Sequence, residues 1–147
     1  DGTMYVANIG DSRLYILRNK HLTCLTKDHN YKNMLRENLK AGKVDMDFYN
    51  SEISRGEALT SYLGLGNIVL IDTNEIPFQL QDEDILMLCS DGLYKTLTEE
   101  QIEAVVTESG GNISIAGERL REIAGRWGRN GQDNTTVILL KISQDCG

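Results

Sequence analysis

The sequence predicts an α+β fold in which an antiparallel sheet is flanked by helices. Several short segments rich in β-branched and aromatic residues indicate strands, and short connections join most of them. Short connections favour antiparallel neighbours, because parallel neighbours need a long crossover. Other segments carry apolar residues at helical spacing, so helices are expected beside the sheet. The 147 residues are enough to bury a core as one domain.

The first half of the chain is expected to contain three strands and a helix. The strands are "MYVANIG", "RLYILRN" and "HLTCLTKD", at residues 4–10, 13–19 and 21–28. Asn19 and Lys20 lie between the last two strands and indicate a hairpin turn. Asn30 can cap a helix over residues 31–42. Residues 43–58 carry little pattern and are expected to be irregular.

The second half is expected to alternate strands and helices. Strands are predicted at residues 68–80, 85–90 and 135–142, with an acidic turn at 82–84 between the first two. Thr98 and Gln101 form a capping box that begins a helix. A longer helix is expected over residues 113–127, where apolar side chains at i, i+3, i+4 and i+7 place Trp127 in the core.

Composition and charge narrow the function classes. The formal net charge of −7 and the pI near 4.8 argue against a nucleic-acid-binding surface, which needs clustered Lys and Arg. Apolar runs fall short of the roughly 20 residues that a membrane span requires. No signal peptide is visible, and the start at "DGT" without Met indicates a processed or truncated end. Cys24, Cys89 and Cys146 have no CxxC spacing, which predicts reduced thiols in a cytoplasmic protein.

Three aspartates lie next to predicted strands. Asp11 follows "MYVANIG", Asp91 follows "ILMLCS", and Asp133 precedes "TTVILLKI". In an antiparallel sheet the exit of one strand lies beside the entrance of the next, so the three carboxylates could meet at one edge. Like charges at that spacing need a cation, and oxygen ligands without His or thiolate favour Mg²⁺ or Mn²⁺. Taken singly, each aspartate is more typical of a turn.

The remaining candidate groups indicate no other chemistry. His21 and His29 lack metal-ligand spacing, and a structural or solvated role is expected for both. No GxGxxG or Walker pattern supports nucleotide binding, and no GxSxG elbow supports a serine nucleophile. The residues by themselves therefore indicate an α+β domain with a candidate carboxylate metal edge.

Five segments in register make the sequence resemble a known family. They are, in this order, "YVANIGDSRLYIL", "LTKDHN", "ALTSYLGLG", "DILMLCSDGLYKTLTEEQI" and "GQDNTTVILLKI". The metal-dependent protein phosphatases of the PPM family, the type 2C serine/threonine phosphatases, carry similar segments in the same order. Each segment is a weak signal alone, whereas five at suitable spacing, from about residue 2 to residue 142, are specific.

The resemblance implies a fold and a set of site residues. The family fold is a sandwich of two antiparallel sheets flanked by helix pairs (α-β-β-α), which would here lack its N-terminal part. Residues 1–147 would form a single domain, the carboxy-terminal two-thirds of a phosphatase domain, with a flap-like segment at about 43–59. Asp91 and Asp133 are implied as ligands of a paired metal centre, and Asp11 as a ligand of a third, weaker metal. No further catalytic residue is implied in this segment.

The resemblance also implies a reaction and its partners. The family hydrolyses phosphoserine and phosphothreonine in proteins with two Mg²⁺ or Mn²⁺ ions, and many members hold a third. Two such ions polarise a phosphate oxygen and lower the pKa of a bridging water, so that a metal-bound hydroxide attacks phosphorus. The implied partners are a phosphorylated protein substrate and an opposing Ser/Thr kinase, with neither nucleic acid nor a membrane span.

Several departures from the family pattern bear on activity. A phosphate-gripping Arg and a "DGxGG" motif precede this segment in the family and are absent here, so the chain alone is expected to be inactive. Lys95 stands where the family often has an acidic residue, and Ser61 replaces a common Arg or Asn. Missing strands would expose apolar surface, and such a fragment can self-associate. The alternative is a non-catalytic phosphatase-like module that binds or regulates a partner, although retention of the three aspartates favours the enzyme.

Overall fold

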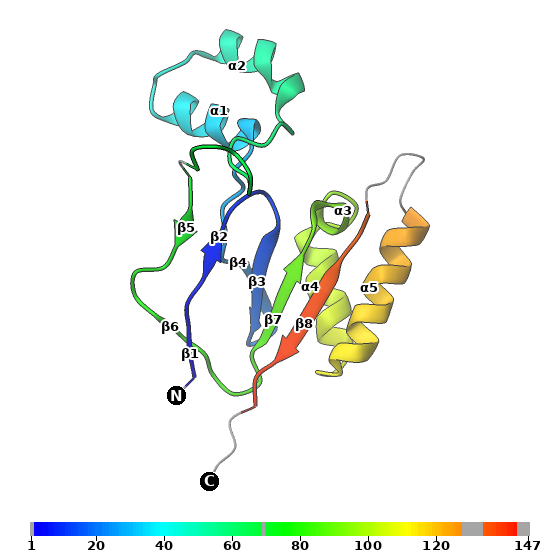
Figure 1. Ribbon diagram of the computed structural model, residues 1–147. Coiled ribbons are helices and arrows are strands. Elements are labelled where there is room, and N and C mark those ends of the chain that lie inside the picture. The colour runs from blue at the N-terminus through cyan, green and yellow to red at the C-terminus, as the bar shows by residue number, and fades with distance from the viewer. Residues whose placement is uncertain (1, 69, 128–133, 144–147) are drawn as a thin grey trace. The chain divides into compact units, whose positions relative to one another are not determined.

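The chain divides into two compact units in a computed structural model that describes residues 2–68, 70–127 and 134–143 (Figure 1). Unit 1 comprises residues 1–5, 12–26 and 74–147, and unit 2 comprises residues 6–11 and 27–73. No helix in the described ranges is both long and apolar enough to cross a membrane. The single domain expected for residues 1–147 stays a prediction.

Unit 1 is built on a four-stranded antiparallel sheet, which confirms the predicted α+β class. Its strands are β3 (Arg13–Arg18), β4 (His21–Cys24), β7 (Ile85–Cys89) and β8 (Val137–Lys141), in the order β4-β3-β7-β8. Its helices are α3 (Asp91–Tyr94), α4 (Glu99–Glu108) and α5 (Ile113–Trp127). A two-stranded pair joins β1 (Thr3–Met4) to β6 (Phe78–Gln79).

One face of this sheet packs against α4 and α5 (Figure 1). Alternate strand residues point to that face, and they include Tyr15, Leu17, Met87 and Cys89. The helices contribute Ile102, Val106, Leu120 and Ala124 to the same core. The burial of Cys89 agrees with its expected role as a small core residue. The prediction for Trp127 is wrong, because α5 ends there and leaves the side chain 55% exposed.

The opposite face of the sheet carries apolar side chains that stay accessible. Leu88, Ile138 and Leu140 are 41%, 52% and 49% exposed. Leu88 pairs directly with Ile138 across β7 and β8, so these side chains lie together on the face that α4 and α5 do not cover. Of the five residues of β7, "ILMLC", all except Leu88 are buried.

The two predicted capping sites are confirmed. The Thr98 side chain accepts from the backbone N–H of Gln101, and the Gln101 side chain accepts from the backbone N–H of Thr98. In unit 2, the Asn30 side chain accepts from the N–H of Asn33 at the start of α1 (Tyr31–Lys40). Both helices therefore begin where a polar side chain accepts from a backbone N–H that has no acceptor within the helix.

Unit 2 differs from the expectation in residues 43–58, which are not irregular. They form α2 (Met46–Glu52) and the 3-10 turn η1 (Ile53–Arg55). The Asp45 side chain caps α2 by accepting from the N–H of Phe48. The helix buries no residue, which is why its sequence lacks a clear apolar stripe.

Two predicted long strands are also wrong, because each is broken into short pieces. Residues 4–10 contain the end of β1 and all of β2 (Ala7–Asn8), and residues 68–80 contain β5 (Asp72–Thr73) and β6. In unit 2, β2 pairs antiparallel with β5, whereas in unit 1 β1 pairs with β6. A change of partner every few residues interrupts the ladder, and an alternation of apolar and polar residues does not reveal such a break.

The β3–β4 hairpin is confirmed, and its turn gives a stability prediction. Asn19 and Lys20 adopt positive φ angles of 53° and 63°, the left-handed region that favours Gly at the second position of such a turn. We expect Lys20→Gly to raise the unfolding free energy by about 0.5–1 kcal/mol in urea denaturation, by relief of that strain. Lys40→Gly, in the helical backbone of α1, should destabilise instead. A destabilised Lys20→Gly variant would contradict the strain argument.

Candidate functional site

Asp91 lies at the point where the central strand β7 turns into a helix. The strand ends at Cys89, Ser90 adopts an extended N-cap conformation, and Asp91 is the first residue of α3. Leu93 and Leu97 are buried in the core beneath this turn. The carboxylate is therefore carried on a short segment that is fixed on one side by a sheet strand and on the other by core packing.

Ser90 ties this turn to the segment that leads into β8. Its N–H donates to the Thr136 carbonyl at 3.1 Å, and its hydroxyl accepts from the Thr136 N–H at 3.0 Å. The same hydroxyl donates to the Asn134 carbonyl at 3.1 Å. Ser90 directly precedes Asp91, and Asn134 directly follows Asp133 in the sequence. Sequence reasoning missed Ser90, because a serine before Asp-Gly has the composition of any turn.

Lys95 forms an ion pair with Asp91. Its Nζ lies 2.8 Å from Asp91 Oδ2, and the two side chains are 40% and 20% exposed, respectively. The residues are four apart, so one helical turn brings them to the same side of the short helix. The carboxylate predicted to bind a metal is thus in contact with a cation of this chain.

Arg13 organises a second polar cluster at the same end of the sheet. Its guanidinium lies over the Tyr94 ring, 3.7 Å from the centroid, and donates to the Tyr15 hydroxyl at 3.0 Å. The Tyr15 hydroxyl donates to Glu99 at 3.2 Å. Burial raises the pKa of the Tyr15 phenol, and the hydrogen bond from Arg13 opposes that rise. The cluster joins β3 to α3 and to the start of α4, which holds the turn around Asp91 in place.

The register of unit 1 brings three strand ends together. Arg13 and Val137 are both Cα partners of Cys89, so the start of β3, the start of β8 and the end of β7 lie at one edge. Asp133 lies outside the described residues, and Asp11 belongs to unit 2. Within the described ranges, no group of three or more His, Cys, Asp or Glu side chains could hold a metal ion. The meeting of the three aspartates stays a prediction.

In unit 2, His29 forms two hydrogen bonds with Gly10, the residue before Asp11. The Gly10 backbone N–H donates to His29 Nδ1 at 3.3 Å, and the His29 backbone N–H donates to the Gly10 carbonyl at 2.9 Å. His29 is buried, which agrees with the structural role expected for it. Ser61 is also buried and donates to the Leu70 carbonyl at 2.8 Å, a local role that its sequence position did not reveal.

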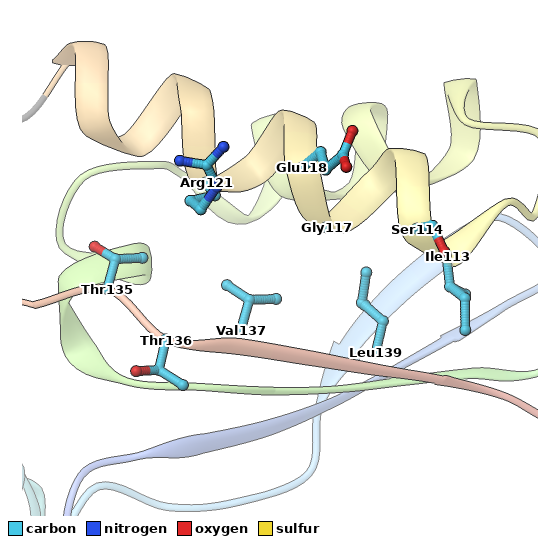
Figure 2. Close-up of a pocket in the computed structure, with 9 residues that line it drawn as sticks. All are labelled: Ile113, Ser114, Gly117, Glu118, Arg121, Thr135, Thr136, Val137 and Leu139. Carbon is cyan, nitrogen blue, oxygen red and sulfur yellow. The ribbon is translucent and has the colours of Figure 1, made fainter.

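A groove of about 590 Å³ runs between α5 and β8 (Figure 2). Figure 2 shows Val137 and Leu139 projecting from β8 toward α5, and the Leu139 side chain lies close to Gly117. The helix contributes Glu118 and Arg121 to the lining. From the segment that leads into β8, Thr135 and Thr136 also line the groove.

The chain is similar in sequence to bacterial phosphatases, although no protein-family model matches it. The serine/threonine phosphatase Stp of Listeria welshimeri is 35% identical over 136 residues, which cover 92% of this chain and 50% of that protein. The chain thus spans about half the length of the curated relatives that it matches.

Solved phosphatase structures share the fold. MsPP, a PPM Ser-Thr phosphatase from Mycobacterium smegmatis, superposes with a TM-score of 0.71 at 32% identity, covering 95% of this chain and 56% of that one. The catalytic domain of the phosphatase PstP, solved with two manganese ions, gives a TM-score of 0.71 at 25% identity, with 98% and 55% covered. These similarities confirm the fold class that the sequence resemblance implied.

Proposed function

This chain is homologous to the carboxy-terminal portion of the PPM-family serine/threonine phosphatases, and from that premise we propose that its protein hydrolyses phosphoserine and phosphothreonine in other proteins with the aid of divalent metal ions. The relatives in sequence and in structure are named serine/threonine phosphatases, and one of them, PstP, was solved with two manganese ions. The residues proposed to bind the metals are Asp91 and Asp133 for the paired centre and Asp11 for a third ion.

The observation that carries the proposal is the hydrogen bonding of Ser90. This residue connects the turn before Asp91 to Asn134 and Thr136 through three hydrogen bonds. Two segments that are more than 40 residues apart in sequence are thereby held together, and in the sequence one directly precedes Asp91 and the other directly follows Asp133. A site with carboxylates beside the ends of neighbouring strands needs such a connection, because small displacements of its ligands weaken a metal site.

The chemistry of Asp91 fits a hard cation. Its carboxylate supplies oxygen ligands, which Mg²⁺ and Mn²⁺ prefer. The same carboxylate already pairs with one cation, the ammonium group of Lys95. When bound, divalent ions would activate water for attack on phosphorus and offset the negative charge of the phosphoryl oxygens. The proposed role of this chain is to hold the turn after β7, which carries Asp91, against the segment that leads into β8.

The proposal is tested with the full-length protein and a phosphothreonine peptide. We expect Mn²⁺-dependent phosphate release that stops on addition of EDTA, with a phosphotyrosine peptide as the comparison substrate. Residues 1–147 alone are expected to release none, because they span about half of the relatives' length. Phosphate release that persists in EDTA, or no release by the full-length protein in Mn²⁺, would contradict the proposed function.

One observation favours a second candidate, a non-catalytic phosphatase-like module that binds or regulates a partner. The ion pair between Lys95 and Asp91 satisfies the carboxylate without a metal. If the full-length protein neither binds Mn²⁺ nor releases phosphate, this second function is the one to pursue.

The proposed partners follow from the enzyme. They are phosphorylated protein substrates and a Ser/Thr kinase that opposes the phosphatase. Self-association of the fragment is also proposed, supported by the accessible apolar face formed by Leu88, Ile138 and Leu140. Among the described residues, Cys24 and Cys89 form no disulfide, which supports a reducing compartment, and a cytoplasmic location is proposed on that basis.

A further inference from the structure

Lys95 is placed by the backbone and not only by its charge. It is the C-cap of α3, and its N–H donates to the Asp91 carbonyl at 2.9 Å. The neighbouring Thr96 hydroxyl donates to the Gly92 carbonyl at 2.9 Å, and the backbone N–H groups of Thr96 and Leu97 both donate to the Leu93 carbonyl. This closed turn keeps the base of the Lys95 side chain one helical turn from Asp91.

The side chains meet at hydrogen-bond distance, with Nζ 2.8 Å from Oδ2. The Asp91 side chain is only 20% exposed, so the pair is partly shielded from solvent. An exposed ion pair contributes little to stability in general. The ion pair therefore matters mainly at Asp91 itself, because the ammonium group neutralises the carboxylate that a metal would bind.

We propose that Lys95 is a built-in competitor of the divalent metal at Asp91 and sets the metal concentration that the protein requires. This inference rests on the proposed function, because it takes Asp91 to be a metal ligand. A divalent ion must share the carboxylate with the ammonium group or displace it, and in either case two positive charges lie within a few ångströms of each other. A neutral side chain at position 95 removes both the competition and the repulsion.

The size of the effect follows from electrostatics. Repulsion between a single and a double positive charge about 5 Å apart in a partly exposed site corresponds to a change in the dissociation constant of about five- to tenfold at physiological ionic strength. Because ions in solution screen this repulsion, the change should be larger at low salt and smaller at high salt. A purely structural effect of the substitution would not depend on salt in this way.

Lys141 provides the matched control. Its Nζ lies 2.8 Å from Glu83 Oε2, so it too forms a surface ion pair in unit 1. Lys141 is paired with Ile85, at the other end of β7 from Asp91. The five residues of β7 separate the two ion pairs by about 16 Å, which is beyond the Debye length in physiological salt. Lys141→Gln removes the same charge without approaching Asp91.

The test is a Mn²⁺ titration of the full-length protein, in which the electron paramagnetic resonance signal of free Mn²⁺ reports binding. We expect Lys95→Gln to lower the dissociation constant for Mn²⁺ about five- to tenfold, with a larger change at low salt. Lys95→Arg, which keeps the cation, and Lys141→Gln should bind Mn²⁺ as the parent protein does.

A Lys95→Gln protein that binds Mn²⁺ no more tightly than the parent would overturn the proposal, as would equal tightening by Lys141→Gln. Asp91→Asn separates this failure from that of the proposed metal site. If Asp91→Asn loses Mn²⁺ binding while Lys95→Gln fails to tighten it, only the role of Lys95 is wrong. If Asp91→Asn binds Mn²⁺ like the parent, both the metal site and the role of Lys95 are overturned.

Discussion

Asp91→Asn is expected to lower the Mn²⁺-dependent phosphatase activity of the full-length protein by a factor of about 100 or more. Asparagine has nearly the shape of aspartate but no negative charge, so a divalent ion loses an anionic ligand while the turn after β7 keeps its packing. The unfolding temperature should change little, because the ion pair that Asp91 makes with Lys95 is partly exposed and contributes little to stability. Initial rates over a range of Mn²⁺ concentrations measure the effect.

Asp82→Asn is the matched control for this substitution. Asp82 is exposed in the turn before β7, at the opposite end of the strand from Asp91, and loses the same charge. The Asp82→Asn protein should have the same phosphatase activity as the parent protein. Undiminished activity in Asp91→Asn would show that Asp91 is not a metal ligand, whereas an equal loss in both variants would point to net charge rather than to coordination.

Asp84→Ala is expected to cause the largest loss of stability, about 1–3 kcal/mol in urea denaturation. The Asp84 side chain is 1% exposed and accepts from Arg18 Nε at 2.8 Å and from Arg18 Nη2 at 2.6 Å. It also accepts from the Gln81 N–H at 2.7 Å. Removing the carboxylate leaves a backbone donor without its partner and takes the paired hydrogen bonds from the guanidinium, which keeps its bond to the Gln79 carbonyl. Glu83→Ala, which removes the exposed ion-pair partner of Lys141, should change the unfolding free energy far less.

The same pair predicts a dependence of stability on pH. The hydrogen bond from Arg18 lowers the pKa of Asp84 below its ordinary value of 3.8, despite the opposing effect of burial. A carboxyl group whose pKa is lower in the folded state stabilises the protein above its ordinary pKa. That contribution is lost as the pH falls through the lowered value. The stability difference between the parent protein and Asp84→Ala should therefore be full at neutral pH and shrink below about pH 4; a difference that stays constant in acid would contradict this role.

Local signals in the sequence were sufficient where one short segment decides the structure. Thr98 with Gln101 predicted the start of α4, the apolar spacing predicted α5 over residues 113–127, and Asn19 with Lys20 predicted the hairpin. In each case the deciding contacts join residues only a few positions apart. The helix α2 was missed because it buries no side chain and so leaves no apolar stripe to recognise.

Asp84 shows where sequence patterns mislead. In the run Asp82, Glu83, Asp84 all three residues have the composition of an exposed acidic turn. Only Asp84 is buried, because Arg18 comes from a strand 66 positions away to pair with it. A contact across that separation leaves no mark within a window of local sequence. Trp127 is the converse case, since its helical spacing indicated the core although the helix ends there in solvent.

By itself, the sequence determined the α+β class, the order of the main elements and the choice of Asp91, Asp133 and Asp11 as candidate ligands, because these depend on residue type and local spacing. Only the tertiary structure decided that Ser90 bonds to Asn134 and Thr136, and that the Lys95 ammonium group contacts the Asp91 carboxylate. The first depends on which strands become neighbours in the sheet. The second depends on the chain closing a helical turn directly after β7, so that position 95 lies over position 91.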